Sequence, residues 1–305
     1  MRLTPAIMQA PDWNDFQAFL AIARAGQLAR AAQALGVDAT TMGRRLRRLE
    51  SRVSATLFEQ TREGQVLTEA GERMLAEVEA MEQAASRIAE NTAGEAGPSG
   101  LLRVSLSEGF GTWFVGQHLR DFTRAHPRLI VDLVVSSGFL SPSKREADLA
   151  VTLSRPRAGP LIAGKLSDYT LRLYASRSYL DEFGEPKRPA DLASGHALVG
   201  YIPEFVYAPE LRYLDEIHPG LAATVRSSSI NAQHRLVASG SGLGVLPCFI
   251  GDRDPELVPV LPERRITRSF WLVTHKDTHS LARVRVFKDW LTDLVAQERG
   301  RLLPG

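Results

Sequence analysis

The sequence predicts an α/β protein of two domains, in which an all-α N-terminal domain is joined by a long helix to a larger α/β domain. Apolar residues recur at helical spacing through the first part of the chain. A glycine-rich stretch, GEAGPSG at 94–100, then interrupts this pattern. Beyond it, strand-like segments alternate with helical ones, which is typical of largely parallel sheets with helices packed on them. The 305 residues are enough for each domain to bury its own core.

Three helices open the N-terminal domain. The spacing of apolar residues predicts a helix over Asn14–Ala25 and a second, alanine-rich helix over Leu28–Leu35. After the tight turn at Gly36, Asp38 is placed to cap a third helix that runs to about Val53, because its carboxylate can accept from the free N–H groups of the first turn. A helix, a glycine turn and a capped helix form a helix-turn-helix, whose second helix enters the major groove of DNA.

The third helix separates an apolar stripe from a basic face. Projected at helical spacing, Met42, Leu46 and Leu49 fall on one side. The other side carries Thr40, Arg44, Arg47, Arg48 and Ser51. Guanidinium groups match phosphate oxygens and the O6/N7 edge of guanine, and residues 24–52 hold seven arginines against two acidic residues. This face predicts DNA binding; the alternative is a charged face that only meets solvent.

A wing and a long helix complete the N-terminal part. Gly64, flanked by apolar residues within Leu57–Leu67, predicts a small β-hairpin, the wing. Thr68 begins a long helix, whose acidic first turn suits the helix dipole. Apolar residues along this helix are spaced 4, 3, 4 and 3, which is a heptad seam and predicts pairing with a second copy of the chain. The dimer contacts assigned to this seam are Met74, Val78, Met81 and Ile88.

The C-terminal part contains two clusters of strands and helices, and the chain then returns to the first cluster. Strands are predicted at 101–106, 129–135, 148–153, 170–175, 197–200, 243–246 and 269–274, and helices at 113–125, 230–239 and 281–295. A glycine run at 240–244 precedes its strand instead of following one, so it predicts a tight turn and not a dinucleotide-binding loop.

Several classes of protein are excluded by the sequence. No apolar run is long enough to span a membrane, and the N-terminal residues lack the pattern of an export signal. The single cysteine, Cys248, excludes an intramolecular disulfide, and the histidines show no metal-ligand spacing. We therefore expect a cytoplasmic protein with no membrane partner, no metal and no cofactor, and we assign no catalytic residue.

The sequence resembles the LysR-type transcriptional regulators. The resemblance is carried by Phe16, Phe19, Ala31-Ala32, Leu35-Gly36-Val37, Arg44 to Glu50, Leu57-Phe58 and Leu67 to Gly71, and the layout of the chain matches the family to the C-terminus. Three positions depart from the family pattern. Asp38 stands where members usually have a serine at the helix cap, and Gln60 and Glu63 stand where the wing usually has arginines.

The resemblance implies a two-lobed effector domain, similar to type II periplasmic binding proteins, with a small-molecule effector in its cleft. It also implies double-stranded DNA as a partner and assembly into a homodimer or homotetramer. On this basis the chain divides into a winged helix-turn-helix domain at 12–67, a linker and dimerisation helix at 68–93, a hinge at 94–100 and an effector-binding domain at 101–305. Within the last domain, lobe 1 takes about 101–163 and 268–305, and lobe 2 about 164–267.

Two sets of binding residues follow. The DNA contacts are assigned to Arg30, Ala39, Thr40, Thr41, Arg44, Arg47, Arg48 and, on the wing, Arg62. The effector contacts are assigned to strand ends and helix starts, where α/β folds of this kind bind ligands, and are Ser107, Glu108, Phe110, Ser136, Ser137, Gly138, Tyr201, Pro203 and Asn231. Glu108, if it faces the cleft, disfavours an anion and suits a cationic or hydroxyl-bearing effector. The alternative is that the serines only cap helices.

The sequence thus predicts a sequence-specific transcriptional regulator that responds to a small-molecule effector. An alternative is an architectural DNA-binding protein whose C-terminal domain only oligomerises, although some 200 residues of α/β domain are then hard to explain. A third hypothesis, an enzyme on the C-terminal scaffold, lacks an assembled catalytic set or a cofactor loop.

Overall fold

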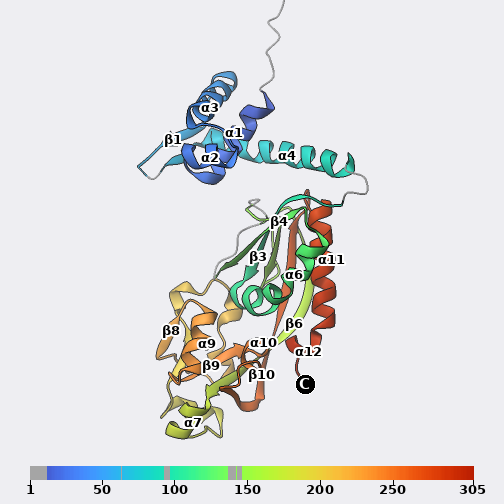
Figure 1. Ribbon diagram of the computed structural model, residues 1–305. Helices are drawn as coiled ribbons and strands as arrows, with labels where there is room; N and C mark the ends of the chain where they lie inside the picture. The colour runs from blue at the N-terminus through green and yellow to red at the C-terminus, as the bar shows by residue number, and fades with distance from the viewer. Residues whose placement is uncertain (1–11, 63, 93–96, 137–141, 143–145) are drawn as a thin grey trace, which may run out of the picture. The chain divides into compact units, whose positions relative to one another are not determined.

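The structure is a computed structural model that describes residues 12–62, 64–92, 97–136, 142 and 146–305 (Figure 1). The chain divides into two compact units, residues 1–92 and residues 93–305, which we call the N-terminal unit and the C-terminal unit. Each unit has its own hydrophobic core.

In its described residues, the N-terminal unit consists of four helices and one hairpin. The helices are α1 (Trp13–Ala25), α2 (Leu28–Ala34), α3 (Ala39–Val53) and α4 (Glu69–Thr92), and the hairpin pairs β1 (Phe58–Gln60) with β2 (Gln65–Leu67). The predicted helices, wing and long helix are therefore confirmed in order and in type.

Local capping explains where these helices begin and end. The side chain of Asp12 accepts a hydrogen bond from the Asn14 N–H, and α1 ends at Gly26 in the left-handed conformation that glycine adopts at low cost. Asp38 accepts from the Thr41 N–H at 2.7 Å, which confirms the predicted cap of α3. The Thr41 N–H and hydroxyl both donate to Asp38 and hold the pKa of its carboxyl below the ordinary value.

The core of the N-terminal unit joins α1, α3 and the first part of α4. Phe19, Met42 and Leu49 are fully buried in it, and Val78 of α4 belongs to the same cluster. The wing is fastened to the turn after α1, because the Gln65 N–H donates to the Gly26 carbonyl at 2.7 Å. The first part of α4 therefore belongs to the core of the N-terminal unit.

Part of the predicted dimer seam packs into the core of its own chain. Val78 is only 1% exposed, and Met74 packs partly buried against the same core, so this part of the apolar stripe is covered within one chain. Met81 and Ile88 are 41% and 65% exposed. Heptad spacing alone does not distinguish a stripe that meets a second chain from one that completes its own core.

The described part of the C-terminal unit is built on one mixed sheet of eight strands, in the order β4-β3-β5-β10-β6-β9-β7-β8. The strands are β3 (Gly100–Ser107), β4 (Leu129–Ser136), β5 (Leu149–Thr152), β6 (Leu161–Ser176), β7 (Leu198–Tyr201), β8 (Val225–Ser227), β9 (Leu243–Pro247) and β10 (Leu257–His275). Its helices are α5 (Glu108–Phe110), the π-helix η2 (Gly111–Val115), α6 (Gly116–Ala125), α7 (Arg177–Phe183), α8 (Leu214–Ile217), α9 (Ile230–Ala238), α10 (Cys248–Gly251), α11 (Ala282–Gln297) and α12 (Arg299–Leu302), with short 3₁₀ turns η4 (Pro189–Ala193), η5 (Pro203–Phe205) and η6 (Pro209–Leu211).

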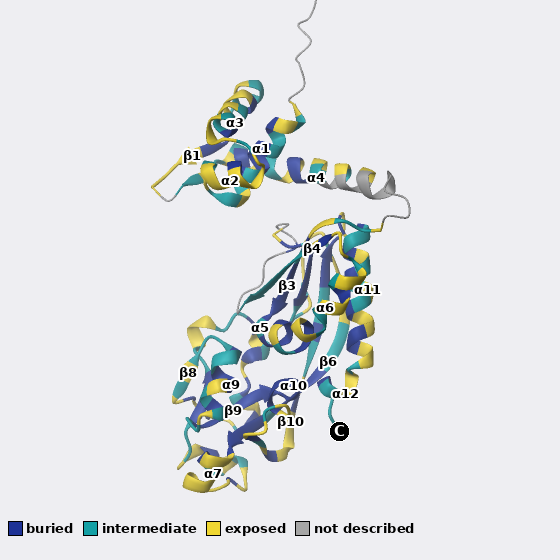
Figure 2. Ribbon diagram, viewed as in Figure 1, coloured by how far each residue is buried: buried dark blue, intermediate teal, exposed yellow. Residues whose placement is uncertain are grey.

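Two parallel half-sheets are joined by a long antiparallel pair. Strands β3, β4 and β5 run parallel and form the first half-sheet, which with α5, α6 and α11 we call lobe 1. Strands β7, β8 and β9 form a second parallel half-sheet, which with α7 and α9 we call lobe 2. Strands β6 and β10 pair antiparallel along both lobes, from Leu161 opposite His275 to Ser176 opposite Leu257 (Figures 1 and 2).

The strands predicted from the sequence for β6 and β10, which cross from one lobe to the other, are shorter than those in the structure. Only 170–175 and 269–274 carry the predicted strand signal, whereas β6 and β10 have 16 and 19 residues. The middle of β10, around Arg264 and Arg265, is exposed and polar, and the pairing shifts register between Val260 and Arg265. A strand that is exposed in the middle loses the apolar run by which a buried strand is recognised.

The first helix of lobe 1 begins earlier than predicted. The chain becomes helical at Glu108, directly after β3, whereas the sequence predicted a helix from Trp113. Gly111 explains the early start, because a Cβ at this position would lie 2.6 Å from a methyl group of Val135 on β4. Glycines that lower the predicted helix propensity here allow the helix to lie close to the sheet.

Substitution of Val78 tests its place in the core. Val78→Ala removes two buried methyl groups, and we expect it to lower the free energy of unfolding of the N-terminal unit by about 1–3 kcal/mol. Ile88→Ala on the same helix is the matched control and is expected to change it by less than about 0.5 kcal/mol. Urea unfolding followed by circular dichroism measures both. Equal effects of the two substitutions would contradict the burial of Val78.

Candidate functional site

The outer face of α3 presents free guanidinium groups. Arg44 and Arg47 are exposed, and neither has a hydrogen bond or ion pair to another part of the chain that the structure describes. Arg30 of α2 and Arg62 of the wing are also exposed. The apolar residues of α3 (Met42, Leu46 and Leu49) are buried on the opposite side, so α3 has the two faces that the sequence predicted.

The other predicted DNA contacts at the start of α3 differ in their exposure and in the hydrogen bonds that they can still form. Ala39 and Thr40 are exposed in the first turn. The Thr41 hydroxyl donates to the Asp38 carboxylate at 2.7 Å. Its hydrogen is therefore used by the cap, and Thr41 can offer a partner only its acceptor lone pairs.

Arg48 is held by the protein itself. Its Nε donates to Asp15 Oδ2 at 2.7 Å and its Nη2 donates to Asp15 Oδ1, while Asp15 is fully buried on α1. Arg52 adds an ion pair of 3.6 Å to the same carboxylate. A buried carboxylate needs such partners, so Arg48 joins α3 to α1, and its guanidinium is not free in the way that the guanidinium of Arg47 is.

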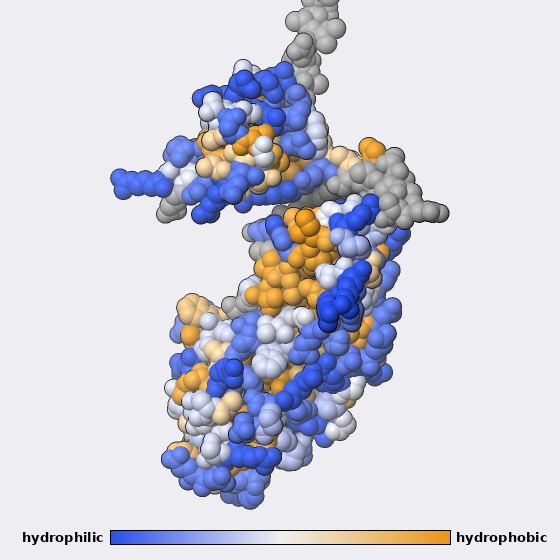
Figure 3. Space-filling model, in the orientation of Figure 1, coloured by the Kyte–Doolittle hydropathy of each residue, from blue (hydrophilic) through white to orange (hydrophobic). Residues whose placement is uncertain are grey.

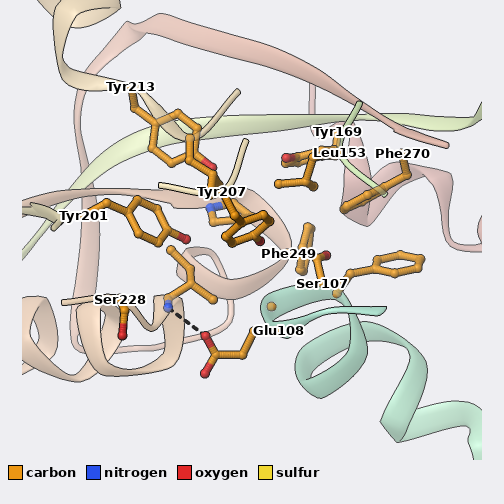
Figure 4. Close-up of a pocket in the computed structure, with 15 residues that line it drawn as sticks. Ser107, Glu108, Leu153, Tyr169, Tyr201, Tyr207, Tyr213, Ser228, Phe249 and Phe270 are labelled. Carbon is orange, nitrogen blue, oxygen red and sulfur yellow. Dashed lines mark hydrogen bonds between the residues drawn. The ribbon is translucent and has the colours of Figure 1, made fainter. Parts of the chain in front are cut away.

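The C-terminal unit has a pocket at the point where its two lobes meet (Figure 4). Lobe 1 contributes the end of β3, with Ser107 and Glu108, and Leu153 after β5. Lobe 2 contributes Tyr201 at the end of β7 and Ile230 at the start of α9. Carboxyl ends of parallel strands from both half-sheets thus converge on it, which is where open α/β folds bind ligands.

Aromatic side chains form most of the pocket wall. They are Phe110, Tyr169, Tyr201, Tyr207, Tyr213, Phe249 and Phe270. Tyr169 of β6 stacks on Phe270 of β10 with ring centroids 4.1 Å apart, so the crossing strands supply one wall. Burial, and secondly the charge of Glu108, raises the pKa of Tyr207 to about 12. Burial and neighbouring phenols raise the pKa of Tyr201 and Tyr213 well above the ordinary value, so these hydroxyls are protonated near pH 7.

Glu108 spans the two lobes. Its carboxylate accepts hydrogen bonds from the Ser229 hydroxyl at 2.7 Å, the Ile230 N–H at 3.0 Å and the Asn231 side-chain amide at 3.0 Å. These three donors lie at the N-terminus of α9, where the helix dipole and free N–H groups favour a negative charge. A side chain of lobe 1 therefore caps a helix of lobe 2.

Further contacts join the lobes around Glu108. The Trp113 indole N–H donates to Asn231 Oδ1 at 2.7 Å and thereby orients the amide that binds Glu108. On another side of the pocket, the Ser154 hydroxyl donates to Glu210 Oε2 at 2.6 Å. The cavity that remains is about 30 Å³, which is room for one or two water molecules and not for a metabolite. The lobes therefore have to separate for a larger ligand to enter.

Four of the predicted effector contacts line this pocket: Ser107, Glu108, Phe110 and Tyr201. Asn231 is not part of the lining, but its side-chain amide donates to Glu108. Pro203 is exposed and is also outside the lining. Ser136 ends β4 and is also outside the lining, while Ser137 and Gly138 lie outside the described residues.

Most of the aromatic wall was not predicted from the sequence. Tyr169, Tyr207, Tyr213, Phe249 and Phe270 were not proposed as contacts. One signal was available: all six tyrosines lie between 169 and 213, and four of them line this pocket. Tyr207 and Tyr213 lie in or beside short 3₁₀ turns, which have no periodicity from which their direction can be predicted.

Neither a metal site nor a membrane-spanning helix is present among the residues that the structure describes. Across the part of the chain that the structure describes, no three His, Cys, Asp or Glu side chains form a group that could hold a metal ion. Within the same residues, no helix combines the length and the apolar character needed to cross a bilayer.

Comparison with known proteins identifies the family. Residues 13–72 match the profile described as "Bacterial regulatory helix-turn-helix protein, lysR family", and residues 95–296 match the "LysR substrate binding domain". The second match alone covers more than half of the chain, so the chain belongs to the LysR family of transcriptional regulators. The predicted family and fold class are confirmed.

Individual relatives agree over nearly the whole length. The chain is 28% identical over 291 residues to the Mau operon transcriptional activator of Paracoccus denitrificans, covering 94% of this chain and 97% of that protein. It is 28% identical over 304 residues to the transcriptional regulator PtxR of Pseudomonas aeruginosa, covering 95% of each. The structure of CrgA, a LysR-type regulator from Neisseria meningitidis, is 25% identical with a TM-score of 0.58, over 92% of this chain and 97% of that one.

The protein is therefore a DNA-binding transcriptional regulator with an effector-binding domain. Its family is one of regulators and not of enzymes, which decides against the third hypothesis of the sequence analysis.

Two neighbouring arginines of α3 give a matched test of the Asp15 ion pair. Arg48→Ala leaves the buried Asp15 carboxylate short of its main partner, and we expect it to lower the free energy of unfolding of the N-terminal unit by about 1–3 kcal/mol. Arg47→Ala is expected to change stability by less than about 0.5 kcal/mol. We expect it instead to weaken binding to all DNA sequences and to lower the salt slope by about one. Urea unfolding and fluorescence anisotropy with labelled DNA measure the two effects. An Arg48→Ala protein of unchanged stability would refute the structural role.

Proposed function

We propose that this regulator reads a specific operator through α3, acts as a homodimer or homotetramer, and is modulated by a small molecule bound in the pocket between its lobes. The observation that carries the effector part is the pocket itself, an aromatic cavity lined by both lobes and closed by Glu108. We retain the domain limits assigned from the sequence, and we place the protein in the cytoplasm because its partner is bacterial DNA.

The geometry of α3 supports different roles for its arginines in binding DNA. Arg44 lies in the N-terminal half of the helix, the half that reaches base edges in helix-turn-helix proteins. Arg47 lies one turn of helix further along and is equally exposed, which suits a phosphate contact. Arg30 and Arg62 extend the basic surface onto α2 and the wing.

Effector control follows from the closed pocket. A ligand in contact with both lobes favours the arrangement to which it binds more tightly, and only by that difference in affinity. Because the cavity of about 30 Å³ is smaller than a metabolite, binding must be accompanied by a change in the contacts of Glu108 or Glu210 across the lobes. That change is the proposed signal.

Two apolar surfaces support self-association. On α4, Met81 and Ile88 are exposed and seven residues apart, which places them on the same side of the helix. In the C-terminal unit, Ile130 is 67% exposed on β4, which is an edge strand of the sheet, and Leu101 is 44% exposed on the adjacent β3. Figure 3 shows apolar atoms gathered over this edge. Exposed apolar patches of this kind mark contacts with other chains.

Base recognition is tested by replacing Arg44. Arg44→Ala is expected to weaken operator binding by about 1–3 kcal/mol and to relax the preference at one base pair, because a guanidinium that contacts a base edge carries sequence information. Binding to a panel of operator variants, located first by footprinting upstream of the regulator's own gene, measures this. The control is Arg47→Ala, which should weaken all the variants alike. An Arg44→Ala protein with the wild-type preference would refute the assignment.

Self-association through α4 is tested by placing a charge on its exposed side. Met81→Asp is expected to lower the oligomeric state and the operator affinity together, because a charge buried in an apolar contact is costly. Ala76→Asp adds the same charge at an exposed position of α4 that points away from Met81, and it should have little effect. Analytical ultracentrifugation with DNA titration measures both. If Met81→Asp sediments and binds like wild type, the contact lies elsewhere.

A further inference from the structure

We propose that the effector is a small organic cation, a protonated amine whose ammonium group binds beside Glu108 within the aromatic pocket. This inference deepens the proposed function and rests on it, since it names the chemical class of the ligand for that site. It depends on the charge of the pocket, on the occupied N-terminus of α9 and on the aromatic wall.

Among the residues that the structure describes, the pocket lining contains one carboxylate and no basic side chain. Glu108 is the acidic residue of this described lining, which includes no lysine, arginine or histidine. The guanidinium of Arg268 acts electrostatically on Tyr169 and Tyr213, but it is already paired with Glu216 and donates to the Glu210 carbonyl at 3.1 Å. A carboxylate or phosphate ligand would therefore meet negative charge without a free counter-ion.

The N-terminus of α9, which would otherwise suit an anion, is already occupied by the carboxylate of Glu108. The N-terminus of α9 offers the donors of Ser229, Ile230 and Asn231, and all three are satisfied by Glu108. Glu108 Oε1 accepts two of these bonds and Oε2 accepts one, while a carboxylate has about four acceptor positions. Oε2 thus has capacity for another donor, and an ammonium group brings three.

The aromatic wall suits the same ligand. Ring faces carry negative electrostatic potential and attract cations, most strongly where water is excluded. Phe110, Phe249 and Phe270 are each no more than 2% exposed, and Tyr201 and Tyr207 line the same pocket as Glu108 (Figure 4). After burial, the charge of Glu108 helps to raise the pKa of Tyr201 and Tyr207. The same negative charge that disfavours a phenolate favours an ammonium ion in the pocket.

The experiment compares three charge classes that share one carbon skeleton. The full-length protein is titrated with linear alkylamines, alcohols and carboxylates of increasing chain length and with their phenylethyl counterparts, at constant ionic strength near pH 7. Calorimetry and the shift in unfolding temperature of the C-terminal unit report binding. We expect an amine to bind at least about tenfold more tightly than its matched alcohol and acid, as a charge-assisted hydrogen bond requires.

Two variants assign the preference to Glu108. Glu108→Gln keeps the shape and removes the charge, and it should lower the ratio of amine to alcohol affinity by about tenfold. Glu210→Gln makes the same chemical change at another contact between the lobes, outside the pocket lining, and should keep the wild-type ratio. A loss of the preference in Glu108→Gln alone separates the charge from a general loosening of the lobes.

The outcomes distinguish the ligand class from the function. If acids or alcohols bind more tightly than their matched amines, or if Glu108→Gln keeps the wild-type ratio, the inference about cations is overturned while the effector pocket stands. If no amine binds, the inference is equally overturned. If an amine binds but the substitution Tyr201→Ala leaves its affinity unchanged, the pocket between the lobes is the wrong site and the effector part of the proposed function falls with it. Operator binding, tested through Arg44, is independent of all these results.

Discussion

The architecture of the C-terminal unit depends on one carboxylate placed at the N-terminus of a helix. Glu108 follows the last residue of β3 and accepts three hydrogen bonds from the first turn of α9, so a strand end in lobe 1 and a helix start in lobe 2 share one charge. Hydrogen bonds to a charged group contribute about 1.5–3 kcal/mol each, and the α9 dipole adds to them. The contact therefore holds the lobes together without any ligand and also sets the electrostatic character of the pocket beside it.

A buried carboxylate also joins two elements of the N-terminal unit. Asp15 on α1 is fully buried, and Arg48 reaches across from α3 to bind it with two hydrogen bonds. The angle between α1 and α3 fixes how the outer face of α3 is presented. The ion pair therefore holds α3, with Arg44 and Arg47, against α1, and it occupies the guanidinium of Arg48 although this side chain is exposed. In both units, one carboxylate joins two elements beside a proposed binding surface through charge-assisted hydrogen bonds.

Much of this architecture could be predicted from the sequence because it is encoded locally. The cap at Asp38, the turn at Gly26 and the two faces of α3 follow from residue type and helical spacing. The misses have a common cause, which is tertiary contact. The burial of Val78, the pairing of Arg48 with a residue 33 positions away and the convergence of Tyr169 and Tyr213 on one pocket depend on segments that are distant in the chain. Periodicity predicts which side of a helix is apolar, but it does not predict what covers that side.

The position of Glu108 also determines how a ligand can compete with the closed arrangement. An anion that binds at the start of α9 must displace Glu108 from Ser229, Ile230 and Asn231, which leaves a carboxylate in the pocket without donors. A group left unsatisfied in this way costs about 1–3 kcal/mol, and more when it is charged, so the anion loses much of what its own hydrogen bonds contribute. A cation adds a donor to Glu108 Oε2 while α9 remains capped, so the separation of the lobes that its entry requires can occur at the Ser154–Glu210 contact instead. The same contact that closes the lobes thus selects against anions and permits an ammonium ion.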